Sequence, residues 1–201
     1  MQILKDDVKN NIIEAAVKEF YLLGYEKASM RTIAKAAGIS VSNTYNYYKS
    51  KEQLFESIIE PVFQQVKAIL KSSLEKSTGQ ISQGDNVSAV IDDIAGMLLQ
   101  MDDRQRQLLI ILVEKSGGTR YEKSREEMVN LLRMHFAEVV RKSSQATQIE
   151  ESQGYILQII AANYVDGLLK ILTDYRSREW AEENLKTLLT YHLNGISGFT
   201  R

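Results

Sequence analysis

The sequence predicts an all-α protein, and three features of the chain support that fold class. Only one proline occurs among 201 residues, and 44% of the residues are hydrophobic, which is enough to bury a sizeable core. Apolar side chains recur at helical spacing, and no repeated pattern of strands and turns interrupts them. We expect about nine helices, of which the first three form a small N-terminal domain and the others a larger one.

The composition also argues against several classes of protein. The chain has no cysteine, so we expect neither a disulfide framework nor a thiolate metal site. Residues 1–11 lack a signal-peptide pattern, and the longest apolar run, residues 108–113, is far shorter than the roughly 20 residues of a membrane span. The sequence therefore predicts a soluble cytoplasmic protein that holds no metal and no cofactor.

Residues 29–51 carry the pattern of two short helices joined by a tight turn. Ser29 and Ser40 each precede a helical segment, where a serine hydroxyl accepts a free amide proton of the first turn. Gly38 stands where the chain leaves the first helix, and glycine adopts the left-handed conformation there without a steric clash. This arrangement predicts a helix-turn-helix.

The second of these helices is expected to have one buried face and one free polar face. Val41, Thr44 and Tyr48 follow i, i+3, i+7 spacing and are predicted to point inward. The free face carries hydroxyls, amides and phenols beside Lys49 and Lys51, a combination that suits a nucleic-acid groove. Its members are Ser42, Asn43, Tyr45, Asn46 and Tyr47.

The distribution of charge favours contact with phosphates at this end of the chain. Residues 27–51 contain five basic residues and no Asp or Glu. Residues 1–51 hold eight Lys or Arg and five Asp or Glu, a balance of +3, whereas residues 52–201 hold seventeen and twenty-one, a balance of −4. A basic end on a slightly acidic body is typical of a segment that meets nucleic acid.

Beyond residue 50 the same periodicity places the remaining helices. Pro61 interrupts an apolar stripe over residues 50–76, and because proline lacks an amide proton we expect a joint or a marked kink at Glu60–Pro61. Residues 77–85 are expected to form a loop. Further helices are predicted at about 87–101, at 104–115, from beyond Gly118 to about Ser143, at about 150–175 and at about 178–197.

The last two predicted helices carry apolar faces too wide for packing on one side only. Ala161, Ala162 and Gly167 would let another helix approach closely. A second copy of the chain is the simplest partner, because a two-fold dimer of a helix-turn-helix protein reads two half-sites. We therefore expect a homodimer through about 150–175 and 178–197.

Residues from about 8 to 59 resemble the TetR family of bacterial transcriptional regulators. In that family a turn Gly-Val-Ser precedes a short recognition helix ending Tyr-x-Tyr-Phe, and Lys-x-Lys-Glu-x-Leu follows. After the segment MRTIAKA, this chain has Gly-Ile-Ser at 38–40, Tyr-Asn-Tyr-Tyr at 45–48 and Lys-Ser-Lys-Glu-Gln-Leu at 49–54. The resemblance implies a DNA-binding domain over 1–50 and a ligand-binding and dimerisation domain over 51–201.

The recognition helix departs from the family pattern at four positions. The family often has Gly, Thr and an aliphatic residue where this chain has Ser42, Asn43 and Thr44, and Phe where it has Tyr48. Thr44 and Tyr48 are expected to pack inward, but each brings a hydroxyl that needs a partner. Ser42 and Asn43 change which bases are read, so the operator sequence cannot be derived from the chain.

Carried over position by position, the resemblance implies two kinds of DNA contact. It places phosphate contacts at Ser29, Thr32, Tyr47 and Lys51, and Arg31 reaches either a phosphate or a base edge. It places groove contacts on the recognition helix, where asparagine pairs with adenine and valine touches a thymine methyl. The groove positions are Val41, Ser42, Asn43, Tyr45 and Asn46, and Ser40 and Lys49 complete the predicted DNA-binding set.

The resemblance further implies a repressor that leaves a palindromic operator when a small molecule binds its C-terminal domain. An effector site needs apolar walls and a few polar groups to orient the ligand. The candidate apolar residues are Met97, Met101, Tyr121 and Met128, and the candidate polar residues are Glu114, His135, Asn163 and Asp166.

Two alternatives within the same fold stay open: a DNA-binding protein that responds to no small molecule, and an activator in place of a repressor.

Catalysis is not expected. The two histidines, His135 and His192, are far apart in the sequence and lack metal-ligand spacing. Adjacent acidic pairs such as Asp92–Asp93 diverge by about 100° on a helix and make poor acid–base couples.

Overall fold

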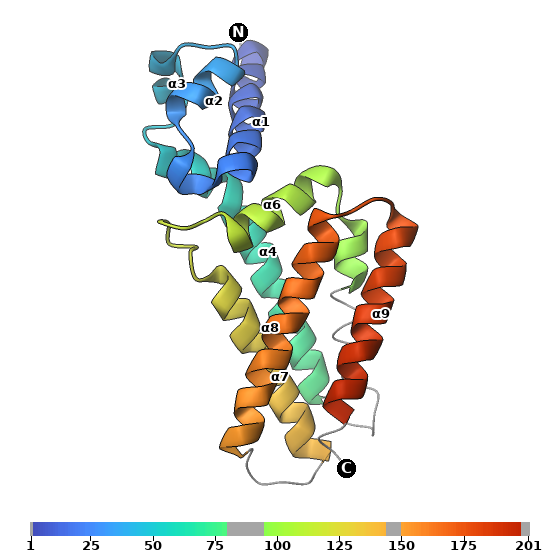
Figure 1. Ribbon diagram of the computed structural model, residues 1–201. Helices are drawn as coiled ribbons and strands as arrows, with labels where there is room; N and C mark the ends of the chain where they lie inside the picture. The colour runs from blue at the N-terminus through green and yellow to red at the C-terminus, as the bar shows by residue number, and fades with distance from the viewer. Residues whose placement is uncertain (1, 80–94, 144–149, 198–201) are drawn as a thin grey trace. The chain divides into compact units, whose positions relative to one another are not determined.

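The computed structural model describes residues 2–79, 95–143 and 150–197, and every regular element within these ranges is a helix (Figure 1). The all-α fold class that the sequence predicts is thereby confirmed. Most of the loop expected at 77–85 and most of the helix expected at 87–101 lie outside the described residues. Residues 95–100 of that expected helix are helical.

The chain divides into two compact units. The first contains Met1–Gln65 and Asp103–Ser124, and the second contains Val66–Asp102 and Arg125–Arg201. Helix α4 contributes to both units, so they cut the chain differently from the two functional domains expected on either side of residue 50. That functional boundary stays a prediction.

Helix α1, Gln2–Lys27, supplies the apolar wall of the N-terminal helices. Ile12, Ala16 and Phe20 share one face of the helix and are fully buried. Gly24 leaves the helical conformation with φ 76° and ψ 166°, a region that other residues adopt only with strain. The chain then completes the last turn of α1 in a new direction, which sets up the start of α2.

Helix α4, Lys51–Gly79, runs through Pro61 as one helix, so the joint predicted at Glu60–Pro61 is wrong. Proline removes the amide that would have bonded to the carbonyl of Ser57, and both Pro61 and Ser57 are exposed. Water can therefore satisfy that carbonyl, which makes the lost helical bond tolerable. The helix also includes residues 77–79, where a loop was expected to begin.

The core of the first unit is a cluster of aromatic rings from three parts of the chain. The ring of Phe55 in α4 lies 4.9 Å from that of Phe20 in α1 and 4.9 Å from that of Tyr25, both in edge-on geometry. Tyr121, in the segment after α6 (Asp103–Glu114), lies 6.2 Å from Phe55. Such edge-to-face contacts add specific geometry to apolar burial.

The second unit contains α7 (Ser124–Ser143), α8 (Glu151–Thr173) and α9 (Arg178–Ser197). Gly167 of α8 faces Leu188 of α9, and a Cβ at Gly167 would lie 2.9 Å from the Leu188 methyl carbons. The small residue that was expected to admit a partner helix therefore admits α9 of the same chain.

Helix α8 has a buried side and an exposed apolar side. Tyr164, Leu168 and Leu172 are buried within the second unit, whereas Tyr155 and Ile159 are 68% and 40% exposed. By length and composition alone α8 is also apolar enough to cross a membrane, a test that the core helix of a soluble protein passes equally. Part of the wide apolar face predicted from the sequence is therefore buried within the chain itself, and the other part is exposed.

Candidate nucleic-acid interface

Two short helices, α2 (Met30–Ala36) and α3 (Val41–Tyr47), form the predicted helix-turn-helix, and both predicted caps are confirmed. The hydroxyl oxygen of Ser29 accepts the amide of Thr32 at 3.1 Å, and that of Ser40 accepts the amide of Asn43 at 3.1 Å. Gly38 has φ 72° in the turn, the left-handed conformation expected there.

The inward face of α3 consists of fewer residues than its spacing suggests. Thr44 and Tyr48 are 0% and 4% exposed, as predicted, but Val41 is 37% exposed, so its predicted inward orientation is wrong. Val41 is the first residue of α3, where the helix has not yet reached the core. Its exposure agrees with the groove position that the family resemblance implies.

The two extra hydroxyls on this inward face have different surroundings. Thr44 Oγ1 donates to the carbonyl oxygen of Ser40 at 3.2 Å, which satisfies the group within its own helix. The hydroxyl of Tyr48 is buried and has no hydrogen-bond partner among the residues that the structure describes. A buried unpaired hydroxyl destabilises the folded state, so Tyr48 carries an energetic cost that a phenylalanine would not.

The outward face of α3 presents the chemistry that reads base edges. Ser42, Tyr45 and Asn46 are exposed, and Asn43 is half-buried beside them. Asn46 Nδ2 donates to Asn43 Oδ1 at 3.4 Å, so the two amides lie together on one side of the helix. A pair of amides offers both donors and acceptors, as bidentate pairing with adenine requires.

The basic side chains around the helix-turn-helix fall into two groups. Arg31, Lys35 and Lys49 are exposed, and within the described residues their charged groups have no hydrogen-bond or ion-pair partner. They are free to meet phosphates. Lys35 was not in the predicted DNA-binding set, although its place in the acid-free stretch of residues 27–51 was the available signal.

Lys51 belongs to the other group. Its ammonium donates to the carbonyl oxygens of Tyr25 at 2.6 Å, Ala28 at 3.0 Å and Glu26 at 3.2 Å. It also lies 4.3 Å from the centroid of the Tyr25 ring. The structure thus places Lys51 at the connection between α1 and α2, with all three of its protons donated inside the chain.

The other predicted phosphate contacts lie near the start of α2 and the end of α3. Ser29 and Thr32 share a hydrogen bond of 2.7 Å between their hydroxyls, and Tyr47 is half-buried. The role in DNA binding of every residue in the predicted set stays a prediction.

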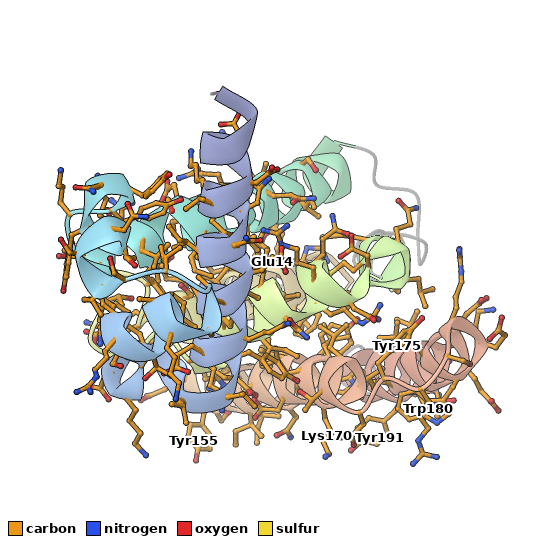
Figure 2. All side chains as sticks on the ribbon, turned by 90° about the horizontal axis from the view of Figure 1, so that it is seen from above. Glu14, Tyr155, Lys170, Tyr175, Trp180 and Tyr191 are labelled. Carbon is orange, nitrogen blue, oxygen red and sulfur yellow. The ribbon has the colours of Figure 1, made fainter. Side chains whose placement is uncertain are left out.

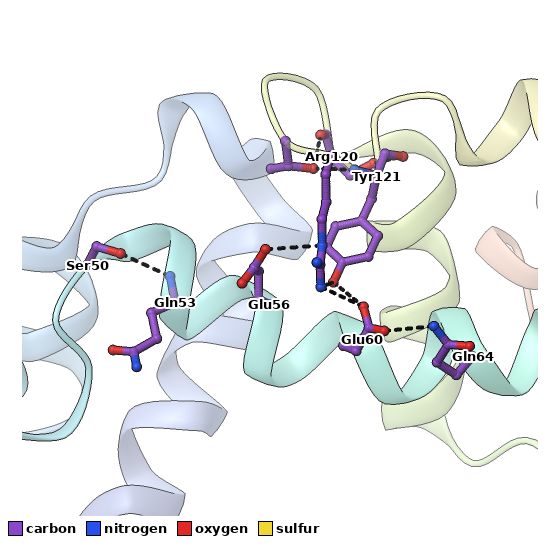
Figure 3. Close-up of polar contacts among 9 residues, drawn as sticks. Ser50, Gln53, Glu56, Glu60, Gln64, Arg120 and Tyr121 are labelled. Carbon is purple, nitrogen blue, oxygen red and sulfur yellow. Dashed lines mark hydrogen bonds and ion pairs between the residues drawn. The ribbon is translucent and has the colours of Figure 1, made fainter.

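A polar cluster that the sequence did not reveal joins α4 to the segment after α6 (Figure 3). Glu60 Oε2 accepts hydrogen bonds from the Tyr121 hydroxyl at 2.5 Å and from Arg120 at 2.8 Å, and Glu60 Oε1 accepts one from Gln64 at 2.7 Å. Arg120 also pairs with Glu56 at 3.1 Å. We call Glu56, Glu60, Arg120 and Tyr121 the α4 polar cluster.

Two pKa values reflect this cluster. Hydrogen bonds from Tyr121 and then from Gln64 lower the pKa of the Glu60 carboxyl, with Arg120 assisting. Burial and then the bond to Glu60 raise the pKa of Tyr121 to about 12. At neutral pH the carboxylate is therefore charged and the phenol neutral, the state in which the phenol donates.

The predicted effector-site residues are spread over both units. Tyr121 is buried in the first unit with its hydroxyl on Glu60, and Glu114 is exposed. In the second unit, Asp166 is exposed and pairs with Arg125 at 2.6 Å, and His135 is buried on α7. Met97, Met101 and Met128 are half-buried, and Asn163 is exposed. Their roles as effector contacts stay predictions.

The segment that contains the helix-turn-helix is similar in sequence to known proteins. The sequence profile of the bacterial regulatory proteins of the tetR family covers residues 12–58. The regulator YhgD of Bacillus subtilis is 34% identical over 71 residues, which span 35% of this chain and 37% of YhgD. The regulator YttP of the same organism is 29% identical over 105 residues, which span 52% of this chain and 48% of YttP. The chain thus matches less than half the length of either relative.

Solved structures match the fold over nearly the whole chain. NalD, the secondary repressor of the MexAB-OprM multidrug efflux pump in Pseudomonas aeruginosa, has a TM-score of 0.57 at 18% identity and covers 95% of this chain and 96% of its own. FadR of Bacillus subtilis, solved with stearoyl-CoA, has a TM-score of 0.56 at 17% identity and covers 93% and 98%.

The all-α fold and the capped helix-turn-helix are of the kind that DNA-binding transcriptional regulators have. The part of the chain that contains this motif, residues 12–58, is similar to the TetR family of bacterial regulatory proteins.

Proposed function

We propose that this regulator is a dimeric repressor that occupies a palindromic operator and is released by a small molecule. The observation that carries the proposal is the arrangement on and beside α2 and α3. Exposed amides and hydroxyls lie there among Arg31, Lys35 and Lys49, whose charged groups have no partner among the described residues. Base edges and phosphates are the ligands that these two kinds of group recognise. A regulator of this kind acts on DNA in the cytoplasm.

The exposed apolar side of α8 supports the dimer. Tyr155, Ile156 and Ile159 on α8 and Tyr191 on α9 are 68%, 40%, 40% and 72% exposed, and Figure 2 shows the two tyrosines pointing outward from their helices. A second copy that pairs α8 and α9 with their counterparts would bury these side chains. Two recognition helices are then available for two half-sites.

The shared fold supports a response to a small molecule. The fold is shared with NalD and with FadR, and FadR was solved with stearoyl-CoA. Long-chain acyl-CoA thioesters and pump-exported drugs therefore belong in any effector panel. An effector releases DNA only to the extent that it binds the released state more tightly than the DNA-bound state.

The direct test is selection of DNA fragments from a random pool by the full-length protein, repeated with each candidate effector. We expect enrichment of a palindrome and, with the right effector, loss of the bound fraction. A pool that yields no palindrome would overturn the dimeric operator reading. A palindrome whose binding no effector changes would favour the regulator that responds to no small molecule, and transcription assays on the recovered site separate repressor from activator.

A further inference from the structure

The hydrogen bonds of Lys51 join the two ends of the helix-turn-helix. Ala28 lies immediately before the cap of α2, and Lys51 is the first residue of α4, immediately after α3. The bond from the Lys51 ammonium to the Ala28 carbonyl spans 23 positions of the sequence. Those positions contain all of α2, the turn and α3, so a single side chain closes the motif.

The carbonyls that accept these bonds need such a partner. Tyr25 and Glu26 lie at the end of α1, where the carbonyl groups of a helix have no amide to bond to. The same end of a helix carries partial negative charge, which favours a cation. Lys51 satisfies both requirements, and the Tyr25 ring covers the ammonium at 4.3 Å from its centroid.

The arrangement leaves the Lys51 ammonium without a donor for DNA. An ammonium has three protons, and the carbonyls of Tyr25, Glu26 and Ala28 lie at 2.6, 3.2 and 3.0 Å. A phosphate could be contacted only after one of these bonds had broken. Lys49, two residues earlier, is exposed, and its ammonium has no partner within the described part of the chain.

The hydrogen bonds around Lys51 also connect to the end of α6. The amide of Tyr25 donates to the carbonyl oxygen of Lys115, just beyond the end of α6, at 2.8 Å, while the carbonyl of Tyr25 accepts from Lys51. One residue therefore connects the end of α6 to the side chain that closes the helix-turn-helix.

We infer that Lys51 is a positioning residue for DNA binding: its ammonium fastens the two ends of the helix-turn-helix together and so fixes the orientation of α3. The phosphate contacts nearby belong to Lys49 and the free cations of α2. This inference rests on the proposed function, because the orientation of α3 matters only where α3 reads DNA.

The test compares Lys51→Met with Lys49→Met in the full-length protein, since methionine keeps an apolar stem and removes the charge. Binding to the selected operator is followed by fluorescence anisotropy over a salt series, well below the melting transition of each variant. For Lys51→Met we expect affinity weaker by about tenfold at every salt concentration, an unchanged slope of log Kd against log salt, and a lower Tm. For Lys49→Met we expect a slope flatter by about 0.9 and an unchanged Tm.

Two results would overturn the inference. In the first, Lys51→Met flattens the slope of log Kd against log salt by about the contribution of one released counterion and leaves Tm unchanged. Lys51 would then be a phosphate contact. A lower Tm with unchanged affinity would make it a residue of stability alone. If Lys51→Met does not fold, Lys51→Arg decides. A guanidinium keeps the charge but cannot direct three bonds to one point as an ammonium does, so the inference expects weaker binding at unchanged slope, whereas a phosphate contact predicts retained affinity.

Failure of the proposed function gives a different result. If the unmodified protein enriches no DNA sequence, the regulator proposal fails, and this inference about α3 fails with it. If the operator is found but Lys51→Met binds it as the unmodified protein does, only the inference fails.

Discussion

The hydroxyl of Tyr121 donates a hydrogen bond of 2.5 Å to the carboxylate of Glu60, a residue 61 positions earlier in the sequence. The bond joins the segment after α6 to α4, one turn before the helix leaves the first unit. Arg120 donates both to the Tyr121 oxygen at 2.7 Å and to Glu60 at 2.8 Å, so the three groups form a closed set of hydrogen bonds. Such a set fixes the position of α4 against that segment more firmly than apolar contact alone.

Replacing Tyr121 by Phe tests the energetic weight of this bond. The variant keeps the ring in its aromatic cluster and removes only the hydroxyl. We expect a loss of about 1–2 kcal/mol in the free energy of unfolding, because the acceptor is charged. Urea denaturation measures it, and Tyr45→Phe at a 43% exposed site is the matched control, for which no change is expected. Equal stability of both variants would contradict a structural role for the bond.

The pH dependence of stability follows from the raised pKa of Tyr121. The group has a pKa of about 12 in the folded protein and about 10 when unfolded. A raised pKa means that folding favours the neutral phenol, so the stabilisation is complete below pH 10 and is lost as pH rises towards 12. We expect the stability advantage of the unmodified protein over Tyr121→Phe to shrink across this range, by at most about 1.4 kcal/mol per pH unit.

Urea denaturation of both proteins at a series of pH values gives that difference. Comparison with Tyr121→Phe cancels the lysines and the other tyrosines that titrate in the same range. A difference that stays constant from pH 9 to pH 11.5 would show that Tyr121 titrates as an exposed tyrosine does.

Replacing Tyr48 by Phe is expected to stabilise the protein, whereas Tyr121→Phe is expected to destabilise it. Within the described ranges the buried hydroxyl of Tyr48 has no partner, so its removal relieves a desolvation cost. We expect a gain of about 1 kcal/mol in the free energy of unfolding, visible as a higher Tm. Tyr47→Phe, one residue earlier and half-buried, is the control. A Tm that falls in Tyr48→Phe would mean that the hydroxyl has a partner in solution.

The exposed apolar side of α8 predicts that the protein has the mass of a dimer in solution. In sedimentation equilibrium the unmodified protein is expected at twice its chain mass of 22.9 kDa. Ile159→Glu places a charge on the 40% exposed position and is expected to weaken the dimer by at least tenfold, because a buried unpaired carboxylate is costly. Met134→Glu, at the 58% exposed site on α7, is the control. A dimer unaffected by Ile159→Glu would place the interface elsewhere.

Local chemistry explains why much of the helix-turn-helix was predictable from the sequence. Ser29, Ser40 and Gly38 act through bonds and torsion angles within four residues of themselves, so the caps and the turn follow from their spacing. The same holds for the bounds of α6 to α9, where helical periodicity extends over several turns. The joint expected at Glu60–Pro61 did not form, because that outcome depends on whether the carbonyl of Ser57 meets water, which is a property of the surface and not of the sequence nearby.

The sequence by itself determined the all-α class, the positions of most described helices and the polar outward face of α3, because each depends on contacts a few residues apart. Only the tertiary structure decided what long-range partners each group meets. It placed Lys51 on the carbonyls at the end of α1 and brought Tyr121 to Glu60 across 61 positions. It also left the Tyr48 hydroxyl without a partner in the described part of the chain. These outcomes depend on which groups packing brings within 3 Å of one another, and no pattern of spacing along one chain specifies that.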